Sequence, residues 1–139
     1  MASVWYPKAF DLMAEGDLDL LVDDLRVFLV DAADYTFANT HDFLDDVPSG
    51  ARVGTPTALA SKTSAYSSNV WTFDAADTTL TSVTGDQSEA VIIYKHTGTD
   101  STSPLVLYLE LSSAVTPNGG NITLQYNASG LGTITATGA

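Results

Sequence analysis

The fold is decided by residues 73–111, which have the sequence FDAADTTLTSVTGDQSEAVIIYKHTGTDSTSPLVLYLEL. Two apolar runs lie in this stretch, AVIIY at 90–94 and LVLYL at 105–109, and a polar segment with Gly98 and Pro104 separates them. Runs of β-branched and aromatic residues between turn formers are typical of strands, so the pair predicts a hairpin with a long loop. Because both runs are apolar at nearly every position, we expect both faces to be covered, with this hairpin at the centre of a sheet.

Other strand-like segments precede the hairpin. Residues 25–30 (LRVFLV) are also apolar at every position except Arg26. This pattern predicts another strand that is covered on both faces. Residues 78–84 (TTLTSVT) alternate weakly, and the Gly85-Asp86 pair that follows predicts a turn into the hairpin. Strands are therefore predicted on the N-terminal side of the hairpin.

Two extended segments are predicted at 51–60 and 63–73. Pro56 places the first of them at a sheet edge or in a broken strand, because proline cannot donate to a strand ladder. Trp71 and Phe73 stand two residues apart in the second segment, hence on one face, and we expect both to enter the core.

Short helical segments are predicted at two places. Residues 6–15 form the first, with Pro7 suited to the first helical position and Gly16 suited to the end. Residues 40–46 predict a helical turn with Thr40 as N-cap and acidic residues in its first turn.

The C-terminal part completes the fold prediction. Residues 122–127 alternate apolar and polar side chains, as in a half-buried strand, and residues 131–137 predict a weak last strand. Strands at short spacing with one or two short helices predict a mostly β fold, an antiparallel β-sandwich or barrel. We expect residues 1–139 to form a single domain.

Composition excludes several classes of protein. The chain is 45% hydrophobic and has no apolar run of the roughly 18 residues that a membrane span needs, so we expect no membrane partner. It contains no cysteine, which excludes disulfides and thiolate metal sites. The first residues lack the basic-then-apolar pattern of a signal peptide, and we expect synthesis in the cytoplasm.

The charge is strongly acidic and uneven. Seventeen acidic and five basic residues give a net charge of -12, which argues against binding nucleic acid. Eleven acidic residues lie in 1–50, whereas residues 111–139 contain no acidic or basic side chain. Two interpretations of this uncharged segment carry equal weight. It forms short buried or threonine-covered strands, or it forms an interface with neighbouring subunits, because interface cores are also depleted in charge.

No group of residues indicates catalysis or a cofactor. His41 and His96 are the only imidazoles, and no nucleophile-elbow or phosphate-binding motif accompanies them. Although Asp42 could orient His41, we expect both histidines to be surface or capping residues. The turn at 17–24 brings together Asp17, Asp19 and Asp23, which are possible metal ligands, but it lacks the glycine and distal glutamate of an EF-hand. We predict a solvated acidic turn, with a metal loop as the minority alternative.

Several phrases of the sequence resemble a family of small virion proteins of tailed phages and prophages. They are FDAADTTLTSVTGDQSEA, IIYKHTGTDSTSPL, VTPNGGNIT and LVDDLRVFLVDAADYTFANTHDFLDDVPSGARVGTPTALASKT. The resemblance extends from Tyr6 to Thr123, and the C-terminal YNASGLGTITATGA departs from the usual ending of the family.

The resemblance implies a non-enzymatic structural protein of the virion, a capsid cement or decoration protein located on the capsid surface. Its partners would be the major capsid protein and other copies of itself, in a small oligomer such as a trimer. One alternative is an adaptor of the neck or tail, or a fibre-base protein. Another is a carbohydrate-binding β-sandwich in which Trp71, Tyr94 or Tyr108 stacks on sugars, although we expect these aromatic residues to be core.

Overall fold

A computed structural model describes residues 3–137, and these residues form a mostly β fold with one α-helix. Short 3-10 turns occur at Leu44–Asp46, Ser49–Ala51 and Asp100–Thr102. The helix and strands follow in the order β1 (Ser3–Trp5), α1 (Pro7–Glu15), β2 (Leu25–Val30), β3 (Arg52–Ala58), β4 (Thr63–Ser67), β5 (Val70–Asp74), β6 (Thr78–Leu80), β7 (Ser88–Lys95), β8 (Leu105–Val115), β9 (Ile122–Leu124) and β10 (Gly132–Thr135).

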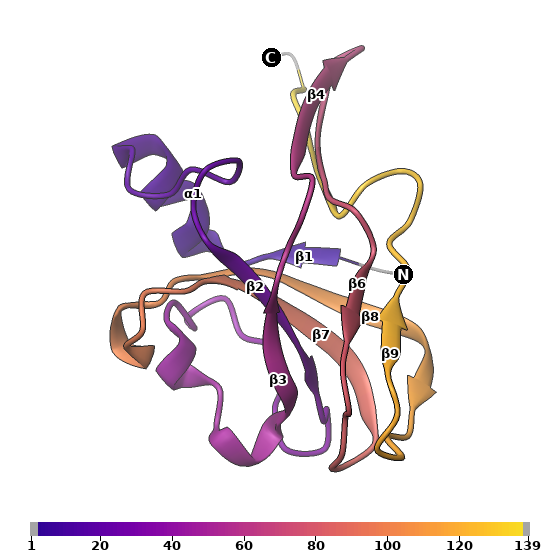
Figure 1. Cartoon of the computed structure of the whole chain (residues 1–139). Helices are drawn as coiled ribbons and strands as arrows, with labels where there is room; N and C mark the ends of the chain where they lie inside the picture. Colours follow the sequence, from indigo (N-terminus) through magenta and orange to yellow (C-terminus); the bar gives the residue numbers. More distant parts are fainter. Residues whose placement is uncertain (1–2, 138–139) are drawn as a thin grey trace.

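The strands form three antiparallel sheets. The largest has the order β1-β8-β7-β2-β3, and the smaller ones have the orders β10-β5-β4 and β6-β9. The predicted hairpin, β7 and β8, therefore lies inside the largest sheet, as its two-sided apolar pattern indicated (Figure 1). Strand β3, which contains Pro56, is an edge strand of that sheet, as predicted.

Strand β7 shows why the apolar runs are continuous. Val91 and Ile93 belong to one buried cluster, whereas Ala90, Ile92 and Tyr94 belong to another on the opposite face of the sheet. All five side chains are at most 2% exposed. Because alternate residues of a strand point to opposite faces, a strand covered on both sides must be apolar at every position. The prediction of two covered faces is confirmed.

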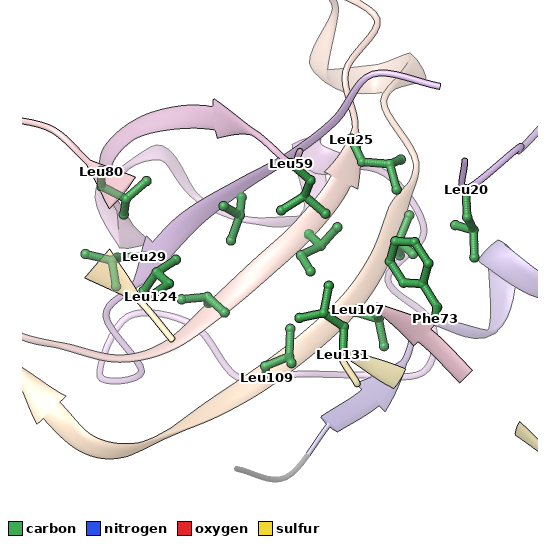
Figure 2. Packing of buried hydrophobic residues seen from close by; sticks show 14 of the residues in the cluster. Leu20, Leu25, Leu29, Leu59, Phe73, Leu80, Leu107, Leu109, Leu124 and Leu131 are labelled. Carbon is green, nitrogen blue, oxygen red and sulfur yellow. The ribbon is translucent and has the colours of Figure 1, made fainter. Parts of the chain in front are cut away.

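The first cluster is closed by the two smaller sheets. Leu80 of β6, Leu124 of β9 and Phe73 of β5 pack with Leu29 of β2 and Leu107 of β8 (Figure 2). Residues from all three sheets thus share one core, a sandwich-like arrangement in which the large sheet forms one layer. The alternation predicted for 122–127 is present, since Leu124 is buried while Thr123 and Gln125 are exposed.

The second cluster lies under the segment 31–51. Tyr35, Leu44 and Val47 from this segment, together with Tyr6, cover the other face of the large sheet. Arg52 fixes the segment, because its guanidinium donates to the carbonyl oxygens of Leu44 and Val47, both at 2.7 Å from Nη2. A loop with little regular structure thus takes the place of a second sheet.

The helical turn predicted at 40–46 is shorter than expected. Only Leu44–Asp46 is helical, its N-cap is Phe43, and the side chain of Thr40 has no capping role. The cap comes from the other end, because Asp46 Oδ2 accepts the backbone N–H of Asp42 at 2.8 Å. This bond holds the pKa of the Asp46 carboxyl below its usual value. The sequence rule was wrong here because Asp46 reaches back to the N–H groups that Thr40 was expected to cap.

The segment predicted as one extended strand at 63–73 is a hairpin. Strands β4 and β5 pair in antiparallel register across a turn at Ser68 and Asn69, whose φ values are 51° and 67°. Two successive residues with positive φ form the type I′ turn that suits a two-residue hairpin loop. Of the two aromatic residues expected in the core, Phe73 is fully buried, whereas Trp71 is only half-buried at the margin.

The strands near the two ends of the chain have pairing partners that the sequence did not predict. Strand β1 joins the edge of β8, with Trp5 opposite Leu107. The predicted last strand is present as β10, but it pairs with β5. Helix α1 has the predicted limits, with Pro7 in its first turn and Gly16 in the left-handed conformation that ends it. Among residues 3–137, no helix has both the length and the hydropathy required to cross a membrane.

Gly132 is required by the close approach of Trp5, and this predicts a measurable cost of substitution. A Cβ atom at position 132 would lie 2.6 Å from Cζ2 of Trp5 and 3.1 Å from Cδ2 of Leu107. We expect Gly132→Ala to lower the free energy of unfolding by about 1–3 kcal/mol, as overpacking does. Gly50→Ala is the control, because no atom lies within 4 Å of the added Cβ there. Equal midpoints of denaturant unfolding for the two variants would contradict this packing.

Candidate functional site

The histidine with the most structured surroundings is His41. Its Nδ1 lies 2.8 Å from the hydroxyl of Tyr35, which in turn lies 2.9 Å from the hydroxyl of Tyr6. The sequence predicted a surface or capping residue at this position, which Asp42 could orient, whereas the hydrogen-bond partner in the structure is Tyr35. The chain Tyr6–Tyr35–His41 runs from the core beneath the segment 31–51 towards the surface, since Tyr6 is fully buried and His41 is half-buried.

The hydrogen-bonded series Tyr6–Tyr35–His41 stabilises the packing beneath the segment 31–51. Burial is the larger cause that raises the pKa of Tyr6 far above its ordinary value, and the hydrogen bond that the Tyr6 hydroxyl shares with Tyr35 raises it further. Burial also raises the pKa of Tyr35. Both phenols therefore stay protonated and act as hydrogen-bond partners rather than as nucleophiles. The rings of Phe37 and Tyr108 pack around them.

Removal of the middle hydroxyl has a predictable effect. Tyr35→Phe keeps the ring but leaves the buried hydroxyl of Tyr6 without its partner, so we expect a loss of about 1–3 kcal/mol in the free energy of unfolding. Thermal or urea unfolding followed by circular dichroism measures it. Tyr66→Phe is the matched control, because the Tyr66 side chain is 68% exposed and water can replace its bond to Asn69. An unchanged stability of Tyr35→Phe would mean that Tyr6 finds another partner.

The acidic turn at 17–24 uses its carboxylates internally. Asp19 Oδ1 accepts the N–H groups of Leu21 and Val22, and Asp23 Oδ2 accepts the N–H of Asp19 at 2.8 Å. Asp23 also forms an ion pair with Lys95, with 3.0 Å between Oδ2 and Nζ. Two of the three possible ligands of the minority metal alternative, Asp19 and Asp23, thus stabilise the turn itself. Leu18 and Leu20, which alternate with the acidic residues, are buried in the core.

A different group of carboxylates lies close together. Oxygen atoms of Asp31, Asp34 and Asp86 all lie within 4.8 Å of one another, and oxygen is the ligand that hard divalent cations prefer. Asp31 follows β2 directly, whereas Asp86 precedes β7, so no spacing rule could have grouped them. Exposed carboxylates commonly gather on a chain with this net charge, and we assign no metal site to them.

The basic side chains among the described residues are engaged within the chain. Lys62 donates to the backbone carbonyl of Asp23. The other four form ion pairs, namely Lys8–Asp11, Arg26–Asp24, Arg52–Asp100 and Lys95–Asp23. Because these pairs use up the positive charge, the surplus of acidic side chains is left without partners. The surface field is therefore negative, and it favours a basic partner.

The uncharged C-terminal segment is exposed. We call its exposed side chains at residues 112–114, 123, 125, 127–129 and 133–137 the uncharged surface. Leu124 and Leu131 anchor it in the core, and a groove of about 300 Å³ runs between the end of β8 and β9. The strands of this segment are therefore threonine-covered rather than buried, which agrees with one form of the first interpretation. The segment exposes side chains that carry no charge of their own.

The three aromatic residues considered for sugar stacking are placed unequally. Tyr94 is 2% exposed and Tyr108 is 9% exposed, and both pack in the cluster beneath the segment 31–51. Trp71 alone reaches the surface, where it lies beside Trp5 with 5.8 Å between ring centroids. A flat, open row of aromatic platforms at the three predicted positions is absent from the described residues.

Geometry thus gives two features suited to binding, the uncharged surface and the negative field of the remaining chain. No protein-family model matches this chain, and none of the curated proteins compared with it is similar to it.

Proposed function

We propose that this protein is a non-enzymatic structural component of a phage virion, a cement or decoration protein that binds and stabilises the lattice of the major capsid protein. The observation that carries the proposal is the uncharged surface, which is exposed on a chain of net charge -12. Interface cores are depleted in charged residues. The resemblance of residues 6–123 to tailed-phage virion proteins supports the same role.

The mechanism is attachment by many modest contacts. A small oligomer at a junction of capsid subunits contacts several of them at once, so that weak single interfaces add up to firm attachment. The uncharged surface packs against the capsid protein, and the acidic remainder faces solvent or a basic patch of the partner. This role needs no cofactor, no catalytic residue and no nucleic acid. The protein is made in the host cytoplasm and resides on the capsid surface.

The alternatives differ in where the same surface binds. A neck or tail adaptor, or a fibre-base protein, would use similar contacts at far fewer positions in the particle. The carbohydrate-binding alternative has less support, because Tyr94 and Tyr108 are buried and only Trp71 could stack on a sugar.

A rebinding experiment tests the proposal. Purified protein is added to particles that lack it, and we expect saturable binding together with a higher temperature of capsid disruption. Thr123→Lys, in the uncharged surface, should weaken this binding. Ser49→Lys is the control, since Ser49 is exposed on the segment that covers the opposite face of the large sheet. Failure of the wild-type protein to bind such particles, or equal binding of the two variants, would contradict the proposal.

A further inference from the structure

The three-stranded sheet forms an arm that projects from the body of the molecule. Strands β4 and β5 extend beyond the large sheet, and the C-terminal strand lies along them (Figure 1). We call β10, β5 and β4 together the arm. Its inner end is fixed by Phe73, which is fully buried, and by Trp5, whose Nε1 donates to the carbonyl of Thr133 at 3.1 Å.

One face of the arm carries a row of large apolar side chains. Trp71 stands directly opposite Tyr66 on one side and Ile134 on the other, so the three side chains lie on the same face. Tyr66 is 68% exposed and Ile134 is 37% exposed. The opposite face carries Ala65, Thr72 and Thr133, which are small or polar.

The apolar row continues onto the body. The ring of Trp5 lies between Trp71 and Phe10, with centroid distances of 5.8 Å and 5.4 Å. Beside Trp71, Met13 and Leu21 line a shallow depression. Six large hydrophobic side chains are exposed among the described residues, and four of them, Phe10, Leu21, Tyr66 and Ile134, gather around this tryptophan pair. Such a concentration marks an interaction surface rather than scattered exposure.

Strand β4 also leaves one edge without a partner. All five of its residues are exposed, and it pairs only with β5. In a hairpin with a two-residue loop, the residues that flank the loop, Ser67 and Val70, form a hydrogen-bonded pair, and such pairs alternate along the ladder. The backbone N–H and C=O groups of Tyr66 and Ser64 therefore point outward from the free edge.

This edge has none of the usual protection against pairing. Proteins protect free edges with proline, with bulges or with charged side chains, above all lysine. Strand β4 has the sequence TSAYS, which contains none of these residues, and its register with β5 is uninterrupted. The free edge of β3, by contrast, carries Pro56 and Arg52.

The lack of charge on β4 allows a second copy of this chain to occupy the edge. Two molecules of net charge -12 repel one another wherever their acidic surfaces meet. Strands β4 and β10 have no charged residue, and Asp74, at the base of the arm, is the only one on β5. Contact through β4 therefore pairs strands that carry no charge, with Asp74 opposite Thr63 and Asp19 beside Ser64 as the acidic side chains at the base of the arm. Exposed charges separated by more than the Debye length of about 8–10 Å are largely screened.

We propose that two copies of this protein pair along β4 in antiparallel orientation across a two-fold axis. The two arms then form one continuous sheet, and the apolar rows of both copies adjoin on one face. The edge is self-complementary, because the same N–H and C=O groups of Ser64 and Tyr66 serve in both molecules. This dimer identifies the surface through which the protein self-associates, and it rests on the self-association in the proposed function. It replaces the trimer expected from the resemblance with a dimer.

Removal of one outward-pointing N–H tests this pairing. Ser64→Pro deletes that N–H without touching the bonds between β4 and β5, whereas Ser64→Ala keeps it. Both variants lose the bond from Trp71 Nε1 to Ser64 Oγ, so the pair is matched. Light scattering with the full chain should give twice the chain mass of 14.6 kDa for the wild type and for Ser64→Ala, and a single chain mass for Ser64→Pro.

Folding of each variant is checked by tryptophan fluorescence and thermal unfolding. If Ser64→Pro fails to fold, Tyr66→Lys decides, because it keeps the backbone groups and places a charge in the exposed apolar row. A single chain mass for the wild type, or a folded proline or lysine variant that remains dimeric, would overturn the proposal.

The capsid role is judged separately. A dimer that never appears in virions refutes that role alone, and a virion protein that is a monomer in solution refutes the dimer alone.

Discussion

Phe28→Ala is expected to lower the free energy of unfolding by about 3–5 kcal/mol, the range for a large aromatic residue removed from a core. Phe28 is fully buried on β2, in the cluster beneath the segment 31–51, and its ring packs edge-on against Tyr94 with 5.7 Å between centroids. The segment above it has little regular structure, so the cavity would remove much of what holds that segment in place. Urea unfolding followed by circular dichroism measures the loss.

Phe10→Ala serves as the control for this experiment. Phe10 is also a phenylalanine, but its side chain is 40% exposed on α1, and we expect a change below about 1 kcal/mol. If the two variants had the same stability, the segment 31–51 would not be packed as a second core layer. The interpretation of β7 as a strand covered on both faces would then fail with it.

Phe73→Ala is expected to have an effect of the same size, about 3–5 kcal/mol, for a different reason. Phe73 is the fully buried residue of β5 at the point where the arm meets the body, and its carbonyl accepts the N–H of Leu131 at 2.8 Å. Its removal weakens the first core cluster and loosens the arm together. Tryptophan fluorescence reports on Trp71 and Trp5. The urea unfolding transition that it follows should therefore become less cooperative or move to a lower urea concentration.

The matched control on the arm is Tyr66→Ala. Tyr66 is equally aromatic but 68% exposed, so the cost should stay below about 1 kcal/mol in the monomer. A larger loss in the free energy of unfolding for Tyr66→Ala than for Phe73→Ala would contradict the account, in which the end of the arm at Phe73 is buried and Tyr66 is exposed. Measurement at low protein concentration separates these effects from any contribution of the dimer.

The central part of the fold could be predicted from the sequence because its cause is local. Strand runs at 25–30, 90–94 and 105–109 are apolar at successive positions, and only burial on both faces explains that pattern. The limits of α1 followed from Pro7 and Gly16 in the same way. Pro56 indicated the edge position of β3 because a missing N–H is tolerated there.

Long-range pairing could not be predicted, because no local pattern encodes it. Strand β10 pairs with β5 rather than with its sequence neighbour β9, and β1 is too short to be recognised by alternation. The hairpin of β4 and β5 was missed because Ser68-Asn69 is a weaker turn former than the Asn-Gly pair typical of type I′ turns. The arm, and with it the apolar row, therefore had no counterpart in the sequence prediction.

Site prediction was limited for a related reason. The uncharged segment after Glu110 is visible in the sequence, but whether it is buried depends on pairing partners that lie more than forty residues away, such as Leu80 opposite Ile122. The chain Tyr6–Tyr35–His41 joins the residue before α1 to two residues of the segment 31–51 at irregular spacing. Only a fold that brings the N-terminal residues against the segment 31–51 makes that contact.

The stoichiometry of the protein in purified virions tests the central claim most directly. Quantitative mass spectrometry of particles from the phage or induced prophage that carries this gene gives the ratio of this chain to the major capsid protein. A protein that decorates the lattice should be present at a fixed ratio to the major capsid protein, of the same order as the number of lattice positions. A ratio matching the few copies of a neck or tail component, or absence from the particle, would contradict the account.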